Sequence, residues 1–134
     1  MSGAGPNKEH KEFHPVEMDG IGWHTPAGYP AGIEQKILAG ALDEAGGSGN
    51  RTRLLRFAPG ARTHVPFVHD YWEEVYLISG DLVVGDGTAG NPETRFTANT
   101  YACRPPGVHH GPFRSETGCL LFEVHYFEYT RFTR

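Results

Sequence analysis

The sequence predicts a single all-β domain. Its 134 residues are a suitable length for one domain, and 38% of them are hydrophobic, which is enough for one core. Eighteen glycines and ten prolines divide the chain into short segments. These segments have the composition of strands, at the regular spacing typical of a β-sandwich or small barrel. We find no repeat, linker or second domain, so we expect a disordered, polar tail over residues 1–12 and one domain over residues 13–134.

The first strands are expected between residues 32 and 60. The segment 32–42 (GIEQKILAGAL) is ambiguous, because Ile33 and Ile37 fit a helical stripe and also fit the alternation of a strand. The surrounding pattern favours a strand. A loop follows over residues 46–50 (GGSGN), and residues 51–60 predict a strand that closes on a Pro-Gly turn.

The remaining strands are expected after residue 72. Residues 73–87 predict a strand, a Gly-Asp turn and a second strand, and residues 94–107 predict a strand pair ending in a rigid turn. Residues 118–132 form the longest β run. One of its faces is continuously apolar: Leu120, Phe122, Val124 and Tyr126. Because Glu123 and His125 share the opposite face, we expect them at the exterior or at an interface.

Composition excludes several classes of partner. Twelve basic and sixteen acidic residues give a net charge of −4, and the absence of a basic block argues against nucleic-acid binding. No apolar run approaches the roughly 20 residues that a membrane span needs. The N-terminus lacks the hydrophobic stretch of a signal peptide, so a cytoplasmic location is expected. Cys103 and Cys119 are too few for a disulfide scaffold and are expected to be free thiols.

Two segments, residues 59–82 and 99–113, resemble the two sequence motifs of the cupin superfamily. The first motif is matched by Gly60, His69, Glu73 and Gly80. The second is matched by Pro105, Gly107 and His110, with Asn99 in place of its leading glycine. The resemblance implies a single-domain cupin, which is a double-stranded β-helix or jelly-roll barrel. It extends to the cupin-like domain of zinc-binding anti-sigma factors and to relatives of acetylacetone dioxygenase, and it assigns residues 32–42 to a strand.

The same resemblance implies a metal site formed by His69, Glu73 and His110. Phe67 stands where the first motif has its first histidine, so one ligand of the family pattern is missing. The stretch before Phe67 is one residue longer than in the motif, and a β-bulge accommodates an extra residue by reversing the side-chain alternation. We therefore expect His64 to be swung inward as a replacement. With His64 the ligand set is three histidines and one glutamate, and without it two histidines and one glutamate.

Imidazole and carboxylate ligands suit a divalent transition metal, Fe, Zn, Mn or Ni, better than Ca or Mg. Three or four protein ligands leave at least one coordination position open for a substrate. Four residues are candidates to line the substrate pocket: Tyr71, Tyr101, Cys103 and His109.

These features favour a metal-dependent enzyme that acts on a small organic molecule. If the metal is iron, O2-dependent cleavage of a C–C bond in a diketone or aromatic ketone is the expected reaction class, because adjacent oxygens would chelate the metal. A redox-neutral cyclase or isomerase of polyketide type is an alternative. A non-catalytic domain that senses a metal or ligand is another. The resemblance also implies a homodimer.

Overall fold

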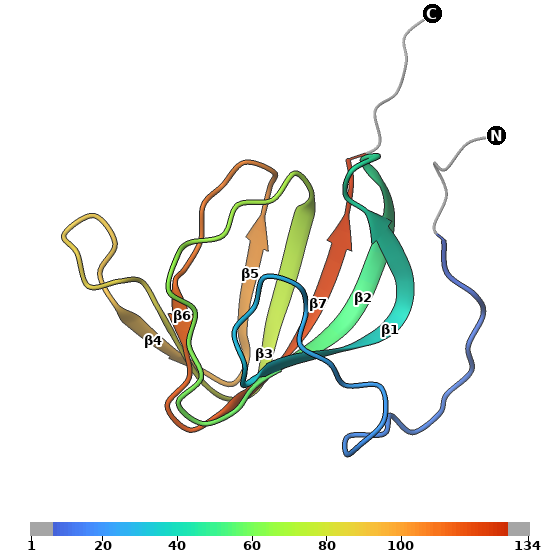
Figure 1. Ribbon diagram of the computed structural model, residues 1–134, viewed down its shortest axis with the longest axis horizontal. Coiled ribbons are helices and arrows are strands. Elements are labelled where there is room, and N and C mark those ends of the chain that lie inside the picture. The colour runs from blue at the N-terminus through green and yellow to red at the C-terminus, as the bar shows by residue number, and fades with distance from the viewer. Residues whose placement is uncertain (1–6, 129–134) are drawn as a thin grey trace, which may run out of the picture.

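The computed structural model describes residues 7–128, which form strands joined by turns and loops (Figure 1). The strands are β1 (Ile33–Asp43), β2 (Ser48–Phe57), β3 (Trp72–Val84), β4 (Thr94–Thr97), β5 (Thr100–Arg104), β6 (Phe113–Arg114) and β7 (Cys119–Tyr126). No helix occurs within the described residues, which confirms the all-β prediction. The same residues therefore contain no helix of the length and apolarity that a membrane crossing requires.

Part of the predicted N-terminal tail contacts the domain. Residues 1–6 lie outside the described residues, but Asn7 and Lys11 donate side-chain hydrogen bonds to carbonyl oxygens of β1. The Asn7 amide donates to Ala41 and the Lys11 ammonium to Leu38, both at 2.7 Å. The described end of the tail therefore runs along this edge strand (Figure 1). The predicted β run over residues 118–132 ends at Tyr126, and residues 129–132 lie outside the described part of the chain.

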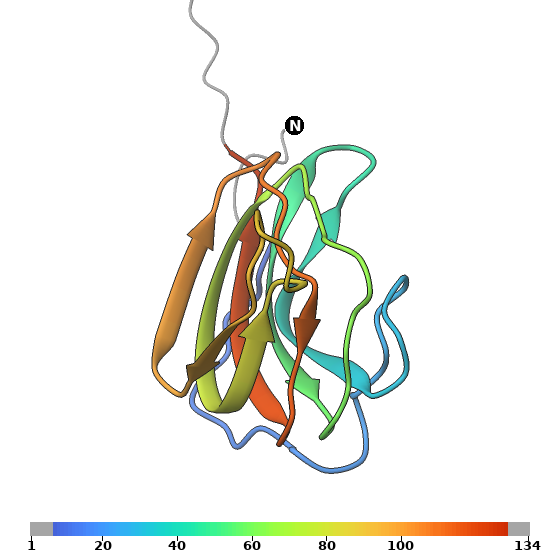
Figure 2. The same cartoon turned by 90° about the vertical axis from the view of Figure 1, so that its left-hand side faces the viewer.

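Strand β3 connects the two layers of the barrel, which are visible edge-on in Figure 2. The strand order is β1-β2-β7-β3-β4, and every pairing is antiparallel. The first half of β3 pairs with β7 and β5, and its second half pairs with β4 and β6. The predicted strands β4 and β5 both form, but each pairs with a different half of β3 rather than with the other.

The predicted Gly-Asp turn in this region is wrong. Gly80 and Asp81 lie inside one continuous strand, which bends instead of reversing. The register shifts between Leu77 and Ser79, and Gly80 has a φ of 85°. A Cβ atom at Gly80 would lie 1.9 Å from the carbonyl oxygen of Gly118, so only glycine allows this close approach. The bend carries the strand from one layer of the barrel into the other.

The inward face of β7 is the reverse of the predicted one. Leu121 pairs with Leu55 of β2 and with Leu77 of β3, and all three are buried core residues. This register turns Glu123 and His125 into the barrel, where they are 4% and 0% exposed. The predicted exterior position of these two residues is therefore wrong. The apolar residues that alternate with the inward ones face outward: Leu120, Phe122, Val124 and Tyr126.

Candidate metal centre and adjoining cavity

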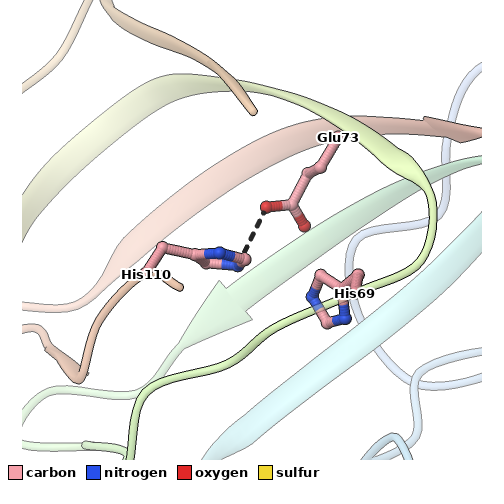
Figure 3. A group of neighbouring side chains, drawn as sticks. All are labelled: His69, Glu73 and His110. Atoms are coloured by element: carbon pink, nitrogen blue, oxygen red, sulfur yellow. Dashed lines mark ion pairs between the residues drawn. The ribbon is translucent and has the colours of Figure 1, made fainter. Parts of the chain in front are cut away.

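Three of the predicted metal ligands come together inside the barrel. His69 lies just before β3, Glu73 lies on β3, and His110 lies in the loop between β5 and β6 (Figure 3). One potential ligand atom from each lies within 4.8 Å of the others. Nε2 of His110 is 3.3 Å from Oε1 of Glu73. This spacing allows the three side chains to share one ion.

Backbone hydrogen bonds hold the two histidine loops against each other. Phe67 and His110 form a two-way bridge, with N–H···O distances of 2.7 and 2.9 Å. The amide of Gly107 donates to the carbonyl of His69 at 2.9 Å. Because segments about 40 residues apart are clamped in this way, His69 and His110 are positioned next to the strand that carries Glu73.

The structure does not bring His64 into this group. Its side chain is exposed and lines a separate surface pocket with Asp86. The preceding residue, Thr63, is 5% exposed and exchanges hydrogen bonds with the backbone of Phe113 at 2.7 and 2.8 Å. Neighbouring side chains of an extended segment point in opposite directions, so an inward Thr63 turns His64 outward. The predicted inward swing of His64 is wrong, and the set of two histidines and one glutamate remains.

An aromatic ring fills the position of the missing histidine. The Phe67 ring centroid lies 6.0 Å from that of His69 and 6.2 Å from that of His110. It also stacks on Tyr29, at 5.0 Å, and on Phe113, at 6.4 Å. Phe67 therefore places an apolar wall beside the three polar groups.

The hydrogen bonding of His110 leaves room for a cation between it and Glu73. Nδ1 of His110 is 3.3 Å from the carbonyl oxygen of Val108, which can only accept, so Nδ1 carries the hydrogen. The lone pair of Nε2 then faces a carboxylate oxygen of Glu73. Burial lowers the pKa of His110, and burial likewise lowers that of His69, which disfavours a proton as the bridge. The donor set therefore suits a metal ion.

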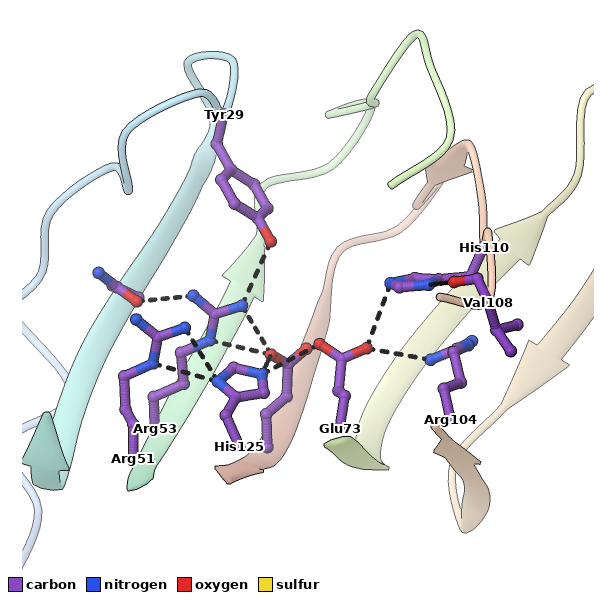
Figure 4. A network of polar contacts seen from close by, with 10 residues as sticks. Tyr29, Arg51, Arg53, Glu73, Arg104, Val108, His110 and His125 are labelled. Atoms are coloured by element: carbon purple, nitrogen blue, oxygen red, sulfur yellow. Dashed lines mark hydrogen bonds and ion pairs between the residues drawn. The ribbon is translucent and has the colours of Figure 1, made fainter. Parts of the chain in front are cut away.

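His125 holds Glu73 from the other side (Figure 4). Nε of Arg51 donates to Nδ1 of His125 at 3.1 Å, and arginine has no acceptor, so Nε2 of His125 carries the hydrogen. This Nε2–H lies 3.0 Å from Oε2 of Glu73 and 3.3 Å from Oε1 of Glu123. The atoms of Glu73, Glu123 and His125 are also close enough to hold a metal ion. Because both His125 nitrogens are engaged in hydrogen bonds, the first group is the better candidate for a metal ion.

A buried ion pair supports this network. Arg53 is 2% exposed, and its Nη2 lies 2.7 Å from Oε1 of Glu123. It also donates to the side chains of Gln35, at 2.7 Å, and Tyr29, at 3.2 Å. Burial alone would raise the pKa of Glu123, but the adjacent Arg53 and the hydrogen bond from His125 outweigh it and hold that pKa well below its usual range. Glu123 is therefore ionised.

A cavity of about 40 Å³ adjoins the metal group. Its charged and imidazole-bearing lining residues are Glu73, Arg104, His110 and Glu123. Its apolar walls include Leu55, Phe67, Val75, Phe113 and Leu121. Nη1 of Arg104 lies 3.3 Å from Oε1 of Glu73. The site thus combines three potential metal ligands, a guanidinium and a largely apolar enclosure.

The predicted pocket residue Tyr71 packs behind the metal group rather than in the cavity. It is 4% exposed, and its ring stacks on His69 with centroids 4.5 Å apart. On its other side the ring lies 5.0 Å from that of His125. Tyr71 therefore orients two histidines of the site.

The predicted pocket positions of Cys103 and His109 are wrong, since both residues are exposed. Tyr101 is 57% exposed and reaches the edge of a second cavity only. The inward residue of β5 at this level is Arg104, which pairs across the sheet with Glu73. Cross-strand partners share a face of the sheet. Because Glu73 points inward, this register makes Arg104 point inward as well.

A family model described as the ChrR cupin-like domain matches residues 11–126. The chain belongs to this ChrR cupin-like family. The match confirms the resemblance that its two motifs had indicated. A comparison with curated proteins found no match.

Solved structures that resemble this ChrR cupin-like chain confirm its single-domain cupin fold. An RmlC-like cupin from Shewanella frigidimarina is 22% identical, with a TM-score of 0.61, covering 91% of this chain and 95% of that one. An acetylacetone dioxygenase from Acinetobacter johnsonii is 17% identical, with a TM-score of 0.61 and coverages of 90% and 78%. The polyketide cyclase RemF from Streptomyces resistomycificus is 15% identical, with a TM-score of 0.62 and coverages of 87% and 81%. At these identities the likeness concerns the fold.

Proposed function

We propose that the protein is a metal-dependent enzyme acting on a small organic molecule. In this proposal His69, Glu73 and His110 hold a divalent transition metal, Fe, Zn, Mn or Ni. The observation that carries it is the approach of His110 Nε2 to a Glu73 oxygen, at 3.3 Å, beside a cavity. A metal bound there would act as a Lewis acid with coordination positions left for a substrate.

The surrounding residues have distinct roles in this proposal. His125 donates to the second oxygen of Glu73 and keeps that carboxylate oriented. Arg104 presents positive charge to a substrate oxygen. The rings of Phe67 and Phe113 limit the access of water to the reacting groups. The cavity beside Glu73 and His110 offers space for a substrate, which favours an enzyme over a purely structural metal site.

The finer proposal is a non-haem iron dioxygenase that cleaves a C–C bond of a diketone or aromatic ketone. Two histidines and one carboxylate are the ligand set of non-haem Fe(II) oxygenases, and an acetylacetone dioxygenase shares the fold. A redox-neutral cyclase or isomerase is the second candidate, because the same fold occurs in the polyketide cyclase RemF. A metal- or ligand-sensing domain is the outcome expected if metal binds and no substrate turns over.

The test of the metal centre is elemental analysis of the purified protein and its variants. We expect His69→Ala, Glu73→Gln and His110→Ala each to lose most of the bound metal. His64→Ala is the matched control and should keep it, because His64 lies outside the group. Circular dichroism of each variant checks that the fold is intact. Retention of metal in all three ligand variants would refute the proposal.

The test of the reaction is an oxygen electrode with the iron-loaded protein and candidate diketones. O2 uptake that is lost in His110→Ala supports the dioxygenase. Conversion of substrate by the zinc-loaded protein without O2 uptake supports the cyclase or isomerase and counts against the dioxygenase.

A homodimer remains our proposal for the assembly. Tyr76, Ile78 and Phe122 on the outward face of the sheet are 40%, 40% and 36% exposed, and a second copy would cover them. Sedimentation equilibrium measures the mass directly, and a monomer at micromolar concentration would contradict the proposal.

A further inference from the structure

A second and larger cavity lies on the inward side of β3, β4 and β5. Its volume is about 240 Å³. The walls are mainly aliphatic and aromatic: Leu77, Leu82, Val84, Phe96 and Leu121. Arg104 is the charged residue among its lining residues, and it also lines the cavity at the metal centre. We call this space the apolar chamber.

The guanidinium of Arg104 has hydrogen-bonding capacity to spare. Among residues 7–128 its side chain donates to Glu73, by one contact of 3.3 Å. Arg53 differs, because its guanidinium bonds with Glu123, Gln35 and Tyr29. A guanidinium has five N–H donors in a planar fork that matches a carboxylate. Arg104 is 20% exposed in its side chain, so a ligand that displaced water from it would form a charge-assisted contact with little competition from solvent.

A metal ion in this group would call for an anion. Arg51, Arg53 and Arg104 contribute three positive charges, and Glu73 and Glu123 contribute two negative charges. Glu44 acts on Arg51 and supplies a third negative charge, so these arginines and carboxylates balance. Because uncompensated charge inside a protein is costly, an anionic ligand would stabilise a divalent metal added to this balanced set.

We propose that Arg104 and the apolar chamber form the binding site of a small organic anion. Its carboxylate or enolate lies on Arg104, beside the metal centre, and its apolar tail lies in the chamber. This inference deepens the proposed function by naming the substrate class. An apolar cavity of about 150 Å³ binds benzene, so the chamber, at about 240 Å³, accommodates one substituted ring or a short acyl chain. Phe96 and Tyr101, which are 37% and 57% exposed, mark the mouth.

The test is isothermal titration of the zinc-loaded protein with pairs of ligands that share a tail. We expect benzoate to bind at least tenfold more tightly than benzamide, because only benzoate carries the charge that Arg104 recognises. Hexanoate should bind roughly 15-fold more tightly than butyrate, since each of its two additional buried methylenes contributes roughly fourfold. Methyl NMR should show benzoate-induced shifts at Leu77, Leu82 and Val84.

Two variants separate the head of the ligand from its tail. Arg104→Gln should abolish the preference for benzoate over benzamide, and Arg104→Lys should restore part of it. Arg62→Gln is the matched control, because Arg62 is exposed and lines a different pocket. Ala102→Leu places extra carbon in the chamber and should remove the gain of hexanoate over butyrate, while the preference for a carboxylate over the matching amide is kept because Arg104 is unchanged.

The outcomes distinguish this inference from the proposed function. Equal binding of benzoate and benzamide, or an unchanged preference in Arg104→Gln, would overturn the anion site. The same titrations on metal-free protein and the metal content of Arg104→Gln separate direct recognition from loss of metal. If no metal binds but benzoate binding still requires Arg104, the anion site is supported and the metal-dependent function is refuted. If metal binds and no carboxylate binds, the metal centre is supported and the anion site is refuted.

Discussion

The buried pair of Arg53 and Glu123 provides the sharpest test of the interior network. Their side chains are 2% and 5% exposed, and the guanidinium contacts Oε1 of Glu123 through two nitrogens, at 2.7 and 2.9 Å. Arg53→Met keeps an unbranched apolar stem in the barrel and removes the charge. The substitution leaves the Glu123 carboxylate buried without its main counter-ion.

Removing one partner of a buried ion pair costs about 3–5 kcal/mol of unfolding free energy. Loss of the hydrogen bonds to Gln35 and Tyr29 acts in the same direction. A domain of this size is stable by about 5–15 kcal/mol, so Arg53→Met is expected to bring the protein close to unfolding. Adding Glu123→Gln removes the unpaired charge and should recover about 2–3 kcal/mol.

The pH dependence of unfolding checks the cause. In the wild type the pKa of Glu123 is held below its usual value of 4.5, so its stabilising contribution is present above that pH and is lost only as pH falls through the lowered pKa. Without Arg53, burial dominates and raises the folded-state pKa. The penalty in Arg53→Met should therefore shrink as pH falls from 7 towards 5, by up to about 1.4 kcal/mol per pH unit.

Urea denaturation followed by circular dichroism at pH 7 and pH 5 measures both effects. The double variant with Glu123→Gln should lose the extra pH dependence, because an amide does not titrate in this range. A destabilisation by Arg53→Met below about 1 kcal/mol would contradict the expected cost of about 3–5 kcal/mol for an unpaired buried charge. A destabilisation that stays the same when Glu123→Gln is added would also contradict it.

Three further changes test the bend in β3 and the metal centre. Gly80→Ala should cost about 2–4 kcal/mol by urea denaturation, because its Cβ would lie 1.9 Å from a backbone carbonyl oxygen, whereas Gly60→Ala, with a similar φ and open space, should cost about 1 kcal/mol. Asp81→Asn should cost about 2 kcal/mol at neutral pH, because Asp81 accepts hydrogen bonds from the amide and hydroxyl of Thr117. Burial alone would raise the pKa of Asp81, but the hydrogen bonds lower that pKa well below 3.8. The stabilisation by the Asp81 carboxylate should therefore be lost from the wild type only as the pH falls below 3.8, and the unfolding free energy of Asp81→Asn should not show this fall. Phe67→His should raise the affinity for metal, because the side chain at this position already faces the cavity. Competition with a chelating dye measures this affinity. An unchanged affinity would mean that the backbone holds residue 67 too far from the ion.

Sequence reasoning located the strands and three of the site residues because both depend on local spacing. The chain keeps two spacings of the cupin motifs despite the missing histidine: that between His69 and Glu73 and that between Gly107 and His110. Alternation along β3 then places Glu73 inward together with Val75 and Leu77, which are buried. These inferences need no knowledge of which strand lies beside which.

The errors arose where orientation depends on a distant partner. His64 faces outward because Thr63 bonds with Phe113, which is far away in sequence. In β7 the apolar face lies outside, because the inward residues Glu123 and His125 find arginine partners on β2. Hydrophobic alternation predicts the buried face only when the buried groups are apolar, and here ion pairs compensate the polar ones.

The metal and the organic anion should bind cooperatively if the interior charges are as described. Arg104 touches the same Glu73 oxygen that faces His110, so a metal placed there would be close to a guanidinium. A carboxylate on Arg104 would offset that repulsion, and it would do so more when the metal is present. Because coupling between two ligands is reciprocal, benzoate should raise the affinity for Zn²⁺ by the same factor by which Zn²⁺ raises that for benzoate. Arg104→Gln removes the repulsion between the guanidinium and the ion, so this variant should bind Zn²⁺ alone at least as tightly as the wild type does. The increase in Zn²⁺ affinity that benzoate causes should be smaller in this variant. A variant that binds Zn²⁺ more weakly than the wild type would show that Arg104 supports the metal ligands instead of competing with the ion.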